Sequence, residues 1–414
     1  MNDKLKLKVL VSAYACEPHK GSEPGVGWNW AKQIARFHEV WVITRANNRE
    51  VIESELKRKP EPNLHFVYYD VPKWLSFWKR KTRGLYLYYL LWQIGAYRLA
   101  KKLNKKERFD LVHHLTFGNV WLPTFMPFLN IPFIWGPIGG GERVPKQFRI
   151  DYQFKAKFEE FVRDIILFFL RINPLFLSLS NKANFIIVRT EETMKQIPNR
   201  YNDKTVKLIE TGVSQIDFES KWQGQKENNN FQIVSVGRLI HLKGFDLAIR
   251  AFASAFKNNG NTKLIIIGDG PDKKRLKKFC MKEKVNEQVI FLGQLSHKDT
   301  VRHMSESSVF LFPSLKEGGA WVLFEAMMLG LPIICLDIAG PREIVSEGCG
   351  FKIKPINPEQ TINDLAGALL KLANDPELRN KMGEAGRRRV MEHYTWEKKG
   401  EFIKEIYGEV IGNR

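Results

Sequence analysis

The stretch of sequence that decides the fold is residues 309–337, VFLFPSLKEGGAWVLFEAMMLGLPIICLD. Two short apolar runs, residues 309–312 and 332–336, have the length of buried strands. Between them lie a glycine-containing loop and a helix, and Gly330 followed by Pro332 predicts where that helix ends. A strand–helix–strand unit of this kind is typical of a parallel sheet covered by helices.

The same alternation of strands and helices extends from this stretch toward the N-terminus. Before it, strands are predicted at residues 231–236, 263–267 and 288–292. A polar segment without a hydrophobic pattern, residues 221–230, is the best linker candidate. An earlier series precedes that linker, with a predicted helix at residues 27–37 and predicted strands at residues 8–15, 39–44, 64–69, 111–115, 133–135, 182–189 and 205–209.

The two series predict an α/β protein with two doubly wound, Rossmann-like domains. We place the first domain at residues 1–220 and the second at residues 221–393, and a length of 414 residues suits two domains. Two such domains leave a cleft between them, and ligands in these sheets bind beyond the carboxyl ends of the strands.

Composition excludes several other classes of protein. With 44% hydrophobic residues the chain is not disordered, and no apolar run reaches the ~18 residues that a transmembrane helix needs. The four cysteines form no CxxC pattern, which argues against a zinc site or a disulfide framework. The first residues lead directly into a strand pattern without a signal peptide, so we expect a cytoplasmic protein.

The net charge of +20 is compatible with solvated lysines, an anionic ligand, a membrane surface or nucleic acid. No nucleic-acid-binding signature accompanies it, so we expect no nucleic-acid partner. Residues 71–109 mix eleven Lys or Arg with one acid, Glu107, and eight large aromatic side chains between Trp74 and Tyr97. This mixture suits an anionic membrane interface, but a core helix with a lysine-rich end explains it equally well.

Two glutamates separated by seven residues carry the strongest functional signal. Glu317 lies in the predicted loop with Gly318 and Gly319, and Glu325 lies inside the predicted helix. The glycines allow a ligand to approach the backbone, and the helix N-terminus offers unpaired N–H groups. We therefore expect the two acids to bind hydroxyl groups of one extended ligand.

Two cations carry the second signal. Arg238 and Lys243 follow Gly237 at the end of a predicted strand, in VGRLIHLKGFDLAIRAF, before a helix that begins near Phe245. Two cations beside a helix N-terminus can bind a diphosphate. Because charge builds up on a departing phosphate, such cations also stabilise a transition state.

Glycine clusters follow two predicted strands of the first domain. Gly21, Gly25 and Gly27 lie within CEPHKGSEPGVGW, which lacks dinucleotide-binding and Walker spacing. The second cluster, GPIGGGE, contains Gly139, Gly140, Gly141 and Glu142. Each cluster alone is explained by a tight turn, but both follow strands of one parallel sheet, so we expect them to hold ligand at the same edge.

Adjacent histidines, His113 and His114, end the predicted strand in FDLVHHLTFGN. Strand alternation places their side chains on opposite faces, so at most one points at a reacting centre. No serine-nucleophile arrangement and no metal-ligand spacing occurs in the sequence.

Together these motifs resemble the retaining glycosyltransferases of family 4, which have the GT-B fold, over nearly the whole chain. GSEPGVG resembles that family's N-terminal glycine loop and VGRLIHLKG its donor-phosphate segment. IIIGDGP and FLGQLSH match its middle elements, and EGGAWVLFE matches its signature of two glutamates. The ending, HYTWEKKGEFIKEIYGEVIG, resembles the closing helix, residues 394–414, that crosses back onto the first domain.

The resemblance implies a donor site for a nucleotide-diphosphate-sugar in the second domain. Arg238 and Lys243 would hold the diphosphate without a metal or other cofactor, and Glu325 would bind the ribose hydroxyls. Glu317 would contact the transferred sugar. Donor-binding residues would further include the base-proximal Leu292 and Leu295 and the loop residues Gly237, Gly318, Gly319 and Ala320.

The first domain would bind the acceptor, a glycan, lipid-linked or polysaccharide molecule, at the inner membrane face. Family members often carry a His-x-His pair, whereas here Leu115 takes the second position, so both His113 and His114 stay catalytic candidates. Two alternatives remain open: another GT-B enzyme, such as a nucleotide-sugar epimerase or a phosphorylase, and a non-catalytic protein that binds an anionic polymer or a membrane.

Overall fold

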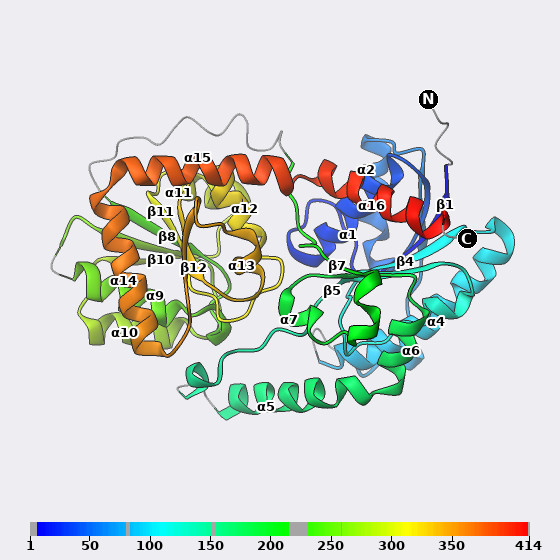
Figure 1. Ribbon diagram of the computed structural model, residues 1–414, viewed down its shortest axis with the longest axis horizontal. Helices are drawn as coiled ribbons and strands as arrows, with labels where there is room; N and C mark the ends of the chain where they lie inside the picture. The colour runs from blue at the N-terminus through cyan, green and yellow to red at the C-terminus, as the bar shows by residue number, and fades with distance from the viewer. Residues whose placement is uncertain are drawn as a thin grey trace. The chain divides into compact units, whose positions relative to one another are not determined.

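The computed structural model describes residues 6–79, 83–150, 152, 154–214, 231–257 and 259–412, which form two compact units (Figure 1). Unit 1 comprises Met1–Gly141, Ile165–Gly212 and Trp396–Arg414, and unit 2 comprises Glu142–Asp164 and Val213–Thr395. The linker predicted at residues 221–230 lies outside the described residues.

Unit 1 is built on a seven-stranded sheet in the order β3-β2-β1-β4-β5-β6-β7, with every pair parallel. The strands are β1 (Lys8–Ala13), β2 (Glu39–Thr44), β3 (Leu64–Tyr68), β4 (Leu111–Thr116), β5 (Phe133–Ile138), β6 (Phe185–Val188) and β7 (Thr205–Lys207). Its helices are α1 (Ser22–Ala35), α2 (Arg49–Arg58), α3 (Lys73–Ser76), α4 (Leu85–Glu107), α6 (Pro174–Lys182), α7 (Glu191–Met194) and α16 (Trp396–Gly412).

Unit 2 is built on a six-stranded parallel sheet in the order β10-β9-β8-β11-β12-β13. The strands are β8 (Gln232–Val236), β9 (Lys263–Ile267), β10 (Val289–Gly293), β11 (Val309–Phe312), β12 (Ile333–Leu336) and β13 (Gly350–Ile353). Its helices are α9 (Phe245–Phe256), α10 (Lys273–Glu283), α11 (His297–Ser305), α12 (Trp321–Met328), α13 (Ala339–Ile344), α14 (Pro358–Asn374) and α15 (Pro376–His393). In Figure 1, α9, α10 and α14 lie together on one side of this sheet.

Both sheets therefore have the same strand order, 3-2-1-4-5-6 in the numbering of each unit, with one further strand in unit 1. In this order the chain direction across the sheet reverses between the first and fourth strands, and ligands of such folds bind at that switch point. The expected doubly wound α/β class is confirmed. The strands are short and almost continuously apolar because helices bury both of their faces.

One segment departs from the predicted boundary at residue 220, because Glu142–Asp164 groups with unit 2. Within it, Val144 and Phe148 are buried in the same hydrophobic cluster as Phe245 and Phe252 of α9. Helix α5 (Phe154–Phe169) starts in this segment and ends in unit 1. At the other end of the chain, α16 groups with unit 1 and packs on α1.

Helix α4 accounts for part of the aromatic and basic stretch at residues 71–109. Its Tyr89 and Trp92 are fully buried, with Tyr88 nearly so, and they pack in the core of unit 1. Trp74 and Phe77 in and beside α3 and Tyr86 in α4 are exposed. Among the described residues, none of the helices is both long and apolar enough to cross a membrane.

Candidate active site

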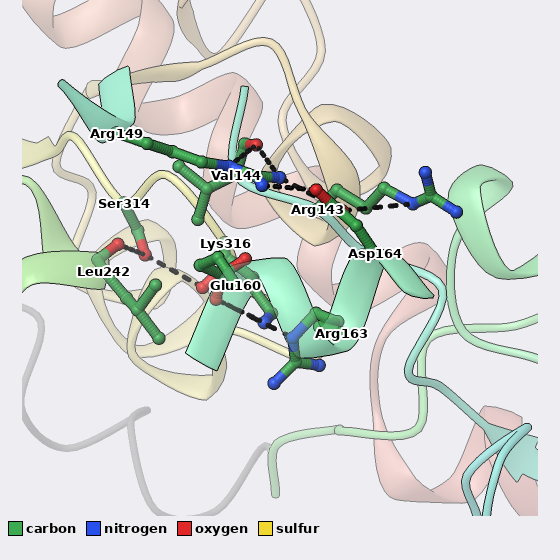
Figure 2. A network of polar contacts seen from close by, with 9 residues as sticks. All are labelled: Arg143, Val144, Arg149, Glu160, Arg163, Asp164, Leu242, Ser314 and Lys316. Atoms are coloured by element: carbon green, nitrogen blue, oxygen red, sulfur yellow. Dashed lines mark hydrogen bonds and ion pairs between the residues drawn. The ribbon is translucent and has the colours of Figure 1, made fainter. Parts of the chain in front are cut away.

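Two loops meet at the switch point of unit 2, where β8 and β11 are neighbours. The β8 loop includes the 3-10 helix η6 (His241–Lys243), and the β11 loop leads into α12. The Leu315 N–H joins the loops by donating to the Leu242 carbonyl at 2.9 Å. The Ser314 hydroxyl donates to the same oxygen at 3.3 Å (Figure 2). The carboxyl ends of two parallel strands thus carry one connected surface.

Lys243 and Glu317 form an ion pair across these two loops. The Lys243 ammonium also lies 5.6 Å from the centre of the Phe312 ring, and its side chain is only partly exposed. Gly244 makes the approach possible: its φ is +63°, and a Cβ there would stand 2.1 Å from the Pro313 carbonyl oxygen. The pairing of a phosphate-binding candidate with a sugar-binding candidate therefore depends on a glycine.

The loop that carries Glu317 is held in place by the start of α13, which follows the next strand of the sheet. The Gly340 N–H, in the first turn of α13, donates to the Glu317 carbonyl at 2.9 Å. A Cβ on Gly340 would meet the Gly318 carbonyl oxygen at 1.8 Å. Ala320, with a φ of +31°, turns the chain into α12. The predicted loop of Glu317, Gly318 and Gly319 is thus fixed by backbone contacts.

Glu325 lies in α12, as the sequence predicts, and its Oε1 is 2.9 Å from His297 Nε2. His297 is the first residue of α11, whose N-terminus is capped by the Ser296 hydroxyl. Sequence reasoning did not select His297, although it lies in the quoted segment FLGQLSH. Neither the spacing nor the residue type indicates that α11 and α12 place these side chains together.

Arg238 lines a cavity of about 410 Å³ at the same edge of the sheet. The Lys243 side chain passes close to Gly237, which lines this cavity, because the Lys243 Cδ lies 4.0 Å from where a Cβ on Gly237 would stand. Arg238 is exposed. The cavity is formed by the loops after β8, β9 and β10 and is lined by Val236, Gly237, Arg238, Ile267, Gly268, Asp269, Gln294, Leu295 and Thr300.

Of the two leucines predicted near a base, Leu295 lines this cavity, whereas Leu292 lies within β10 and is not part of the lining. Asp269 and Thr300 line it without having been selected from the sequence. The Lys273 ammonium, 3.0 Å from Asp269 Oδ2, holds the pKa of this carboxyl below its usual range.

The first glycine cluster is mostly helical, which corrects the predicted loop. Gly21 is the N-cap of α1, whereas Gly25 and Gly27 lie inside the helix, which begins at Ser22 and not at residue 27. A Cβ on Gly27 would stand 2.1 Å from the Ala15 carbonyl oxygen, so this glycine lets α1 pack closely on the end of β1. Gly21 does not have that restriction, because a Cβ there would have open space around it.

The second glycine cluster follows β5, as predicted, but it is filled by the protein's own groups. A Cβ on Gly140 would meet the Asn119 side chain at 2.0 Å, and one on Gly141 would meet the Glu192 carbonyl oxygen at 2.5 Å. Gly139 lies against the Arg189 side chain, and Glu142 is buried in unit 2. Close packing within the chain is sufficient to explain why glycine stands here.

His113 and His114 are both buried within β4, which argues against the catalytic role considered for them. The two ring nitrogens of His113 lie 2.8 Å from the Tyr407 hydroxyl and 2.6 Å from the Gly136 carbonyl oxygen. His114 Nε2 lies 3.3 Å from the Tyr89 hydroxyl. Burial lowers the pKa of His113 to about 4 and that of His114 to about 3, so both stay neutral at pH 7.

Two further features of the described residues bear on the choice of site. A larger cavity, about 540 Å³, lies in unit 1 near the amino ends of β5 and β6, the edge opposite to where doubly wound sheets bind ligands. We therefore choose the smaller cavity beside Arg238. Across the described residues, no group of three or more His, Cys, Asp or Glu is placed to hold a metal ion.

Known proteins resemble this chain in sequence and in structure. Residues 217–389 match the family model described as "Glycosyl transferases group 1". An uncharacterized glycosyltransferase of Methanocaldococcus jannaschii is 25% identical over 372 residues, which cover 87% of this chain and 93% of that protein. The alignments with two other proteins from the same organism cover 59% and 57% of those proteins' length.

Solved structures match over almost the whole chain. Sucrose-phosphate synthase from Thermosynechococcus elongatus superposes with a TM-score of 0.68 at 16% identity, covering 99% of this chain and all of that one. Anabaena HepE in complex with UDP and glucose gives a TM-score of 0.59 at 15% identity, covering 97% of this chain and all of that one. These matches, with the two parallel sheets, show the GT-B fold. Residues 217–389 are thus similar to the glycosyl transferases group 1 family, on a chain that has the GT-B fold.

Proposed function

We propose that the chain is a retaining glycosyltransferase of family 4 that transfers a sugar from a nucleotide-diphosphate-sugar to a glycan, lipid-linked or polysaccharide acceptor. The observation that carries the proposal is the Lys243–Glu317 pair at the switch point of unit 2, next to the cavity lined by Arg238. Cations and acids meet there at the edge where doubly wound sheets bind ligands.

In this proposal Arg238 and Lys243 bind the diphosphate. The Lys243 ammonium exchanges part of its contact with Glu317 for a phosphate oxygen, and the freed Glu317 carboxylate accepts hydrogen bonds from hydroxyls of the sugar. Glu325, in contact with His297, accepts hydrogen bonds from the ribose hydroxyls. The two cations neutralise the charge that develops on the leaving phosphate, so the proposal requires no metal.

The chemical step breaks the bond between the sugar's anomeric carbon and the diphosphate oxygen and forms one to an acceptor oxygen on the same face. The acceptor's proton passes to the departing phosphate. No side-chain base from β4 is needed in this scheme, which suits the burial of His113 and His114.

We further propose that the acceptor binds at unit 1 and that the enzyme works in the cytoplasm, at the inner face of a membrane. Trp74, Phe77 and Tyr86 are exposed and could contact such a surface, beside the cluster of lysines in the same stretch. Tyr88, Tyr89 and Trp92 belong to the core instead, so the surface predicted from residues 71–109 is smaller than the sequence suggests.

The donor is identified by a thermal-shift screen of nucleotide-sugars, since a ligand that binds only the native state raises the melting temperature. Arg238→Ala, Lys243→Ala and Glu325→Ala should each remove most of the shift given by the donor. Lys278→Ala is the matched control, because Lys278 is an exposed cation of unit 2 outside the site.

The chemistry is tested by NMR of the product formed with that donor. Retention at the anomeric carbon, with release of the nucleoside diphosphate and dependence on an acceptor, is the expected result. Turnover without an acceptor would favour an epimerase, and dependence on free phosphate would favour a phosphorylase. Full activity of the Arg238 and Lys243 variants would overturn the site assignment.

A further inference from the structure

Helix α5 presents a large apolar face to solvent. Its exposed residues include Phe154 at 85%, Phe161 at 60% and Phe168 at 76% relative accessibility. The exposed apolar face consists of Phe154, Phe158, Phe161, Val162, Ile165, Ile166, Phe168 and Phe169. Surface helices of globular proteins normally turn such a stripe inward, so this arrangement calls for a partner.

The opposite face of α5 is held by polar contacts (Figure 2). Glu160, only 3% exposed, lies with its Oε1 at 3.3 Å from the Lys316 ammonium and 3.7 Å from Arg163 Nε. One turn later, Asp164 pairs with Arg149, whose guanidinium also donates to the Val144 carbonyl. Ion pairs therefore fix the helix while its phenylalanines point away from them.

The width of the apolar face favours a flat partner over a second helix. At about 100° per residue, its eight residues occupy about 160° of the helix circumference. The seam of a two-stranded coiled coil is narrower and uses only two positions in seven. A broad face with five phenylalanines suits insertion into the boundary between lipid headgroups and acyl chains.

Charge identifies the kind of lipid surface. Lys155 and Lys157 are exposed: Lys157, at about −60° from Phe154, borders the apolar face, and Lys155, at about 100°, lies within it near the end of the helix. Two of the three acids of α5, Glu160 and Asp164, are engaged with the cations described above, which leaves Glu159 as the exposed acid. The two lysines reach headgroup phosphates, and the net charge of +20 attracts the whole chain to an anionic surface.

We propose that α5 is an interfacial helix that lies in the plane of an anionic membrane with Phe154, Phe158 and Phe161 among the acyl chains. This surface is distinct from the residues 71–109 considered above, and it does not depend on the donor site or on the identity of the acceptor. The inference rests on a helix whose charged side faces the protein and whose apolar side faces outward.

The test is flotation of the full chain with vesicles of phosphatidylcholine mixed with phosphatidylglycerol, compared with vesicles of phosphatidylcholine alone. Wild type should float with the mixed vesicles. Phe158→Ser combined with Phe161→Ser should weaken binding more than tenfold, because two phenylalanine side chains would no longer be buried among the acyl chains. Lys155→Glu combined with Lys157→Glu should weaken binding to mixed vesicles and lower its salt sensitivity, because fewer cations contact the anionic headgroups.

Two controls make the outcomes distinct. Trp74→Ser combined with Phe77→Ser perturbs the other aromatic surface, and turnover of the donor with a soluble acceptor, together with an unchanged melting temperature, shows that each variant is folded. Loss of flotation in the Trp74 and Phe77 variant, with retention in the Phe158 and Phe161 variant, would overturn the proposal.

Failure of wild type to float, or equal flotation with neutral vesicles, would also overturn it. So would a dimer of wild type that the Phe158 and Phe161 changes convert to a monomer without affecting flotation. Normal flotation with no sugar transfer would instead reject the proposed function and leave the interfacial helix standing.

Discussion

Replacing Gly340 by alanine tests whether the backbone around Glu317 is the part of the molecule that positions the donor. A Cβ at this residue would lie 1.8 Å from the Gly318 carbonyl oxygen, where Cβ contacts in proteins stay beyond 3.0 Å. The two groups must therefore separate by about 1.2 Å. Both are backbone atoms, so no side-chain rotation relieves the clash.

The expected cost is larger for activity than for stability. A displacement of about 1 Å in a group that positions substrate can reduce the rate by about 10²-fold. Overpacking at one site costs about 1–3 kcal/mol of unfolding free energy, which lowers the melting temperature of a domain of this size by about 2–4 °C for each kcal/mol. Gly340→Ala should thus give a folded protein with strongly reduced kcat/KM.

The assay is steady-state release of the nucleoside diphosphate, with donor binding measured separately by calorimetry. Gly367→Ala is the matched control: Gly367 lies in α14 of the same unit, and a Cβ there meets nothing within 4 Å. That change should leave activity intact and stabilise the protein by about 0.4–1 kcal/mol. Wild-type kcat/KM in Gly340→Ala would refute the view that this backbone contact sets the position of Glu317.

Three further changes test other features. Burial keeps His113 and His114 neutral in the folded protein, whereas both bind a proton in the unfolded chain below about pH 6.5. The free energy of unfolding should therefore fall by about 2 kcal/mol per histidine from pH 7 to pH 5. His114→Phe should reduce that loss in urea titrations, and an unchanged loss would contradict a neutral buried ring. Glu160→Gln should lower the free energy of unfolding in urea by about 3 kcal/mol, because Lys316 is left buried without its carboxylate. Combining Glu160→Leu with Lys316→Met should recover most of that free energy. Purely additive losses in the double-mutant cycle would contradict the pairing. Gly27→Ala should lower the melting temperature by several degrees because its Cβ would stand 2.1 Å from a carbonyl oxygen, and an unchanged value would contradict the tight packing of α1.

Most of the fold could be predicted from hydrophobic pattern. The apolar runs at residues 39–44, 263–267 and 309–312 match β2, β9 and β11 without adjustment. Strand β13 was missed because Gly350–Ile353 contains a lysine and only two large apolar residues. The start of α1 was placed too late because three glycines at residues 21, 25 and 27 suggested a loop, whereas two of them lie in the helix and Gly27 packs closely on the end of β1.

The candidate site could be predicted only in part from the sequence. Lys243 and Glu317 stand 74 positions apart, and only the parallel sheet order brings the loops after β8 and β11 together. The alternation of strands and helices predicts a parallel sheet but leaves more than one strand order open, so both residues could be selected from the sequence whereas their pairing could not. The contact of Glu325 with His297 could not be predicted either, because it depends on how α11 and α12 pack.

The interleaving of the two units has a consequence for the order in which a ribosome can complete them. Unit 2 needs Val144 and Phe148, which leave the ribosome well before Val213–Thr395, so all its parts are present once residue 395 has emerged. Unit 1 begins first but must wait for α16, whose Tyr407 lies against His113 in its interior. The half of the protein that is translated first is therefore the half that finishes folding last.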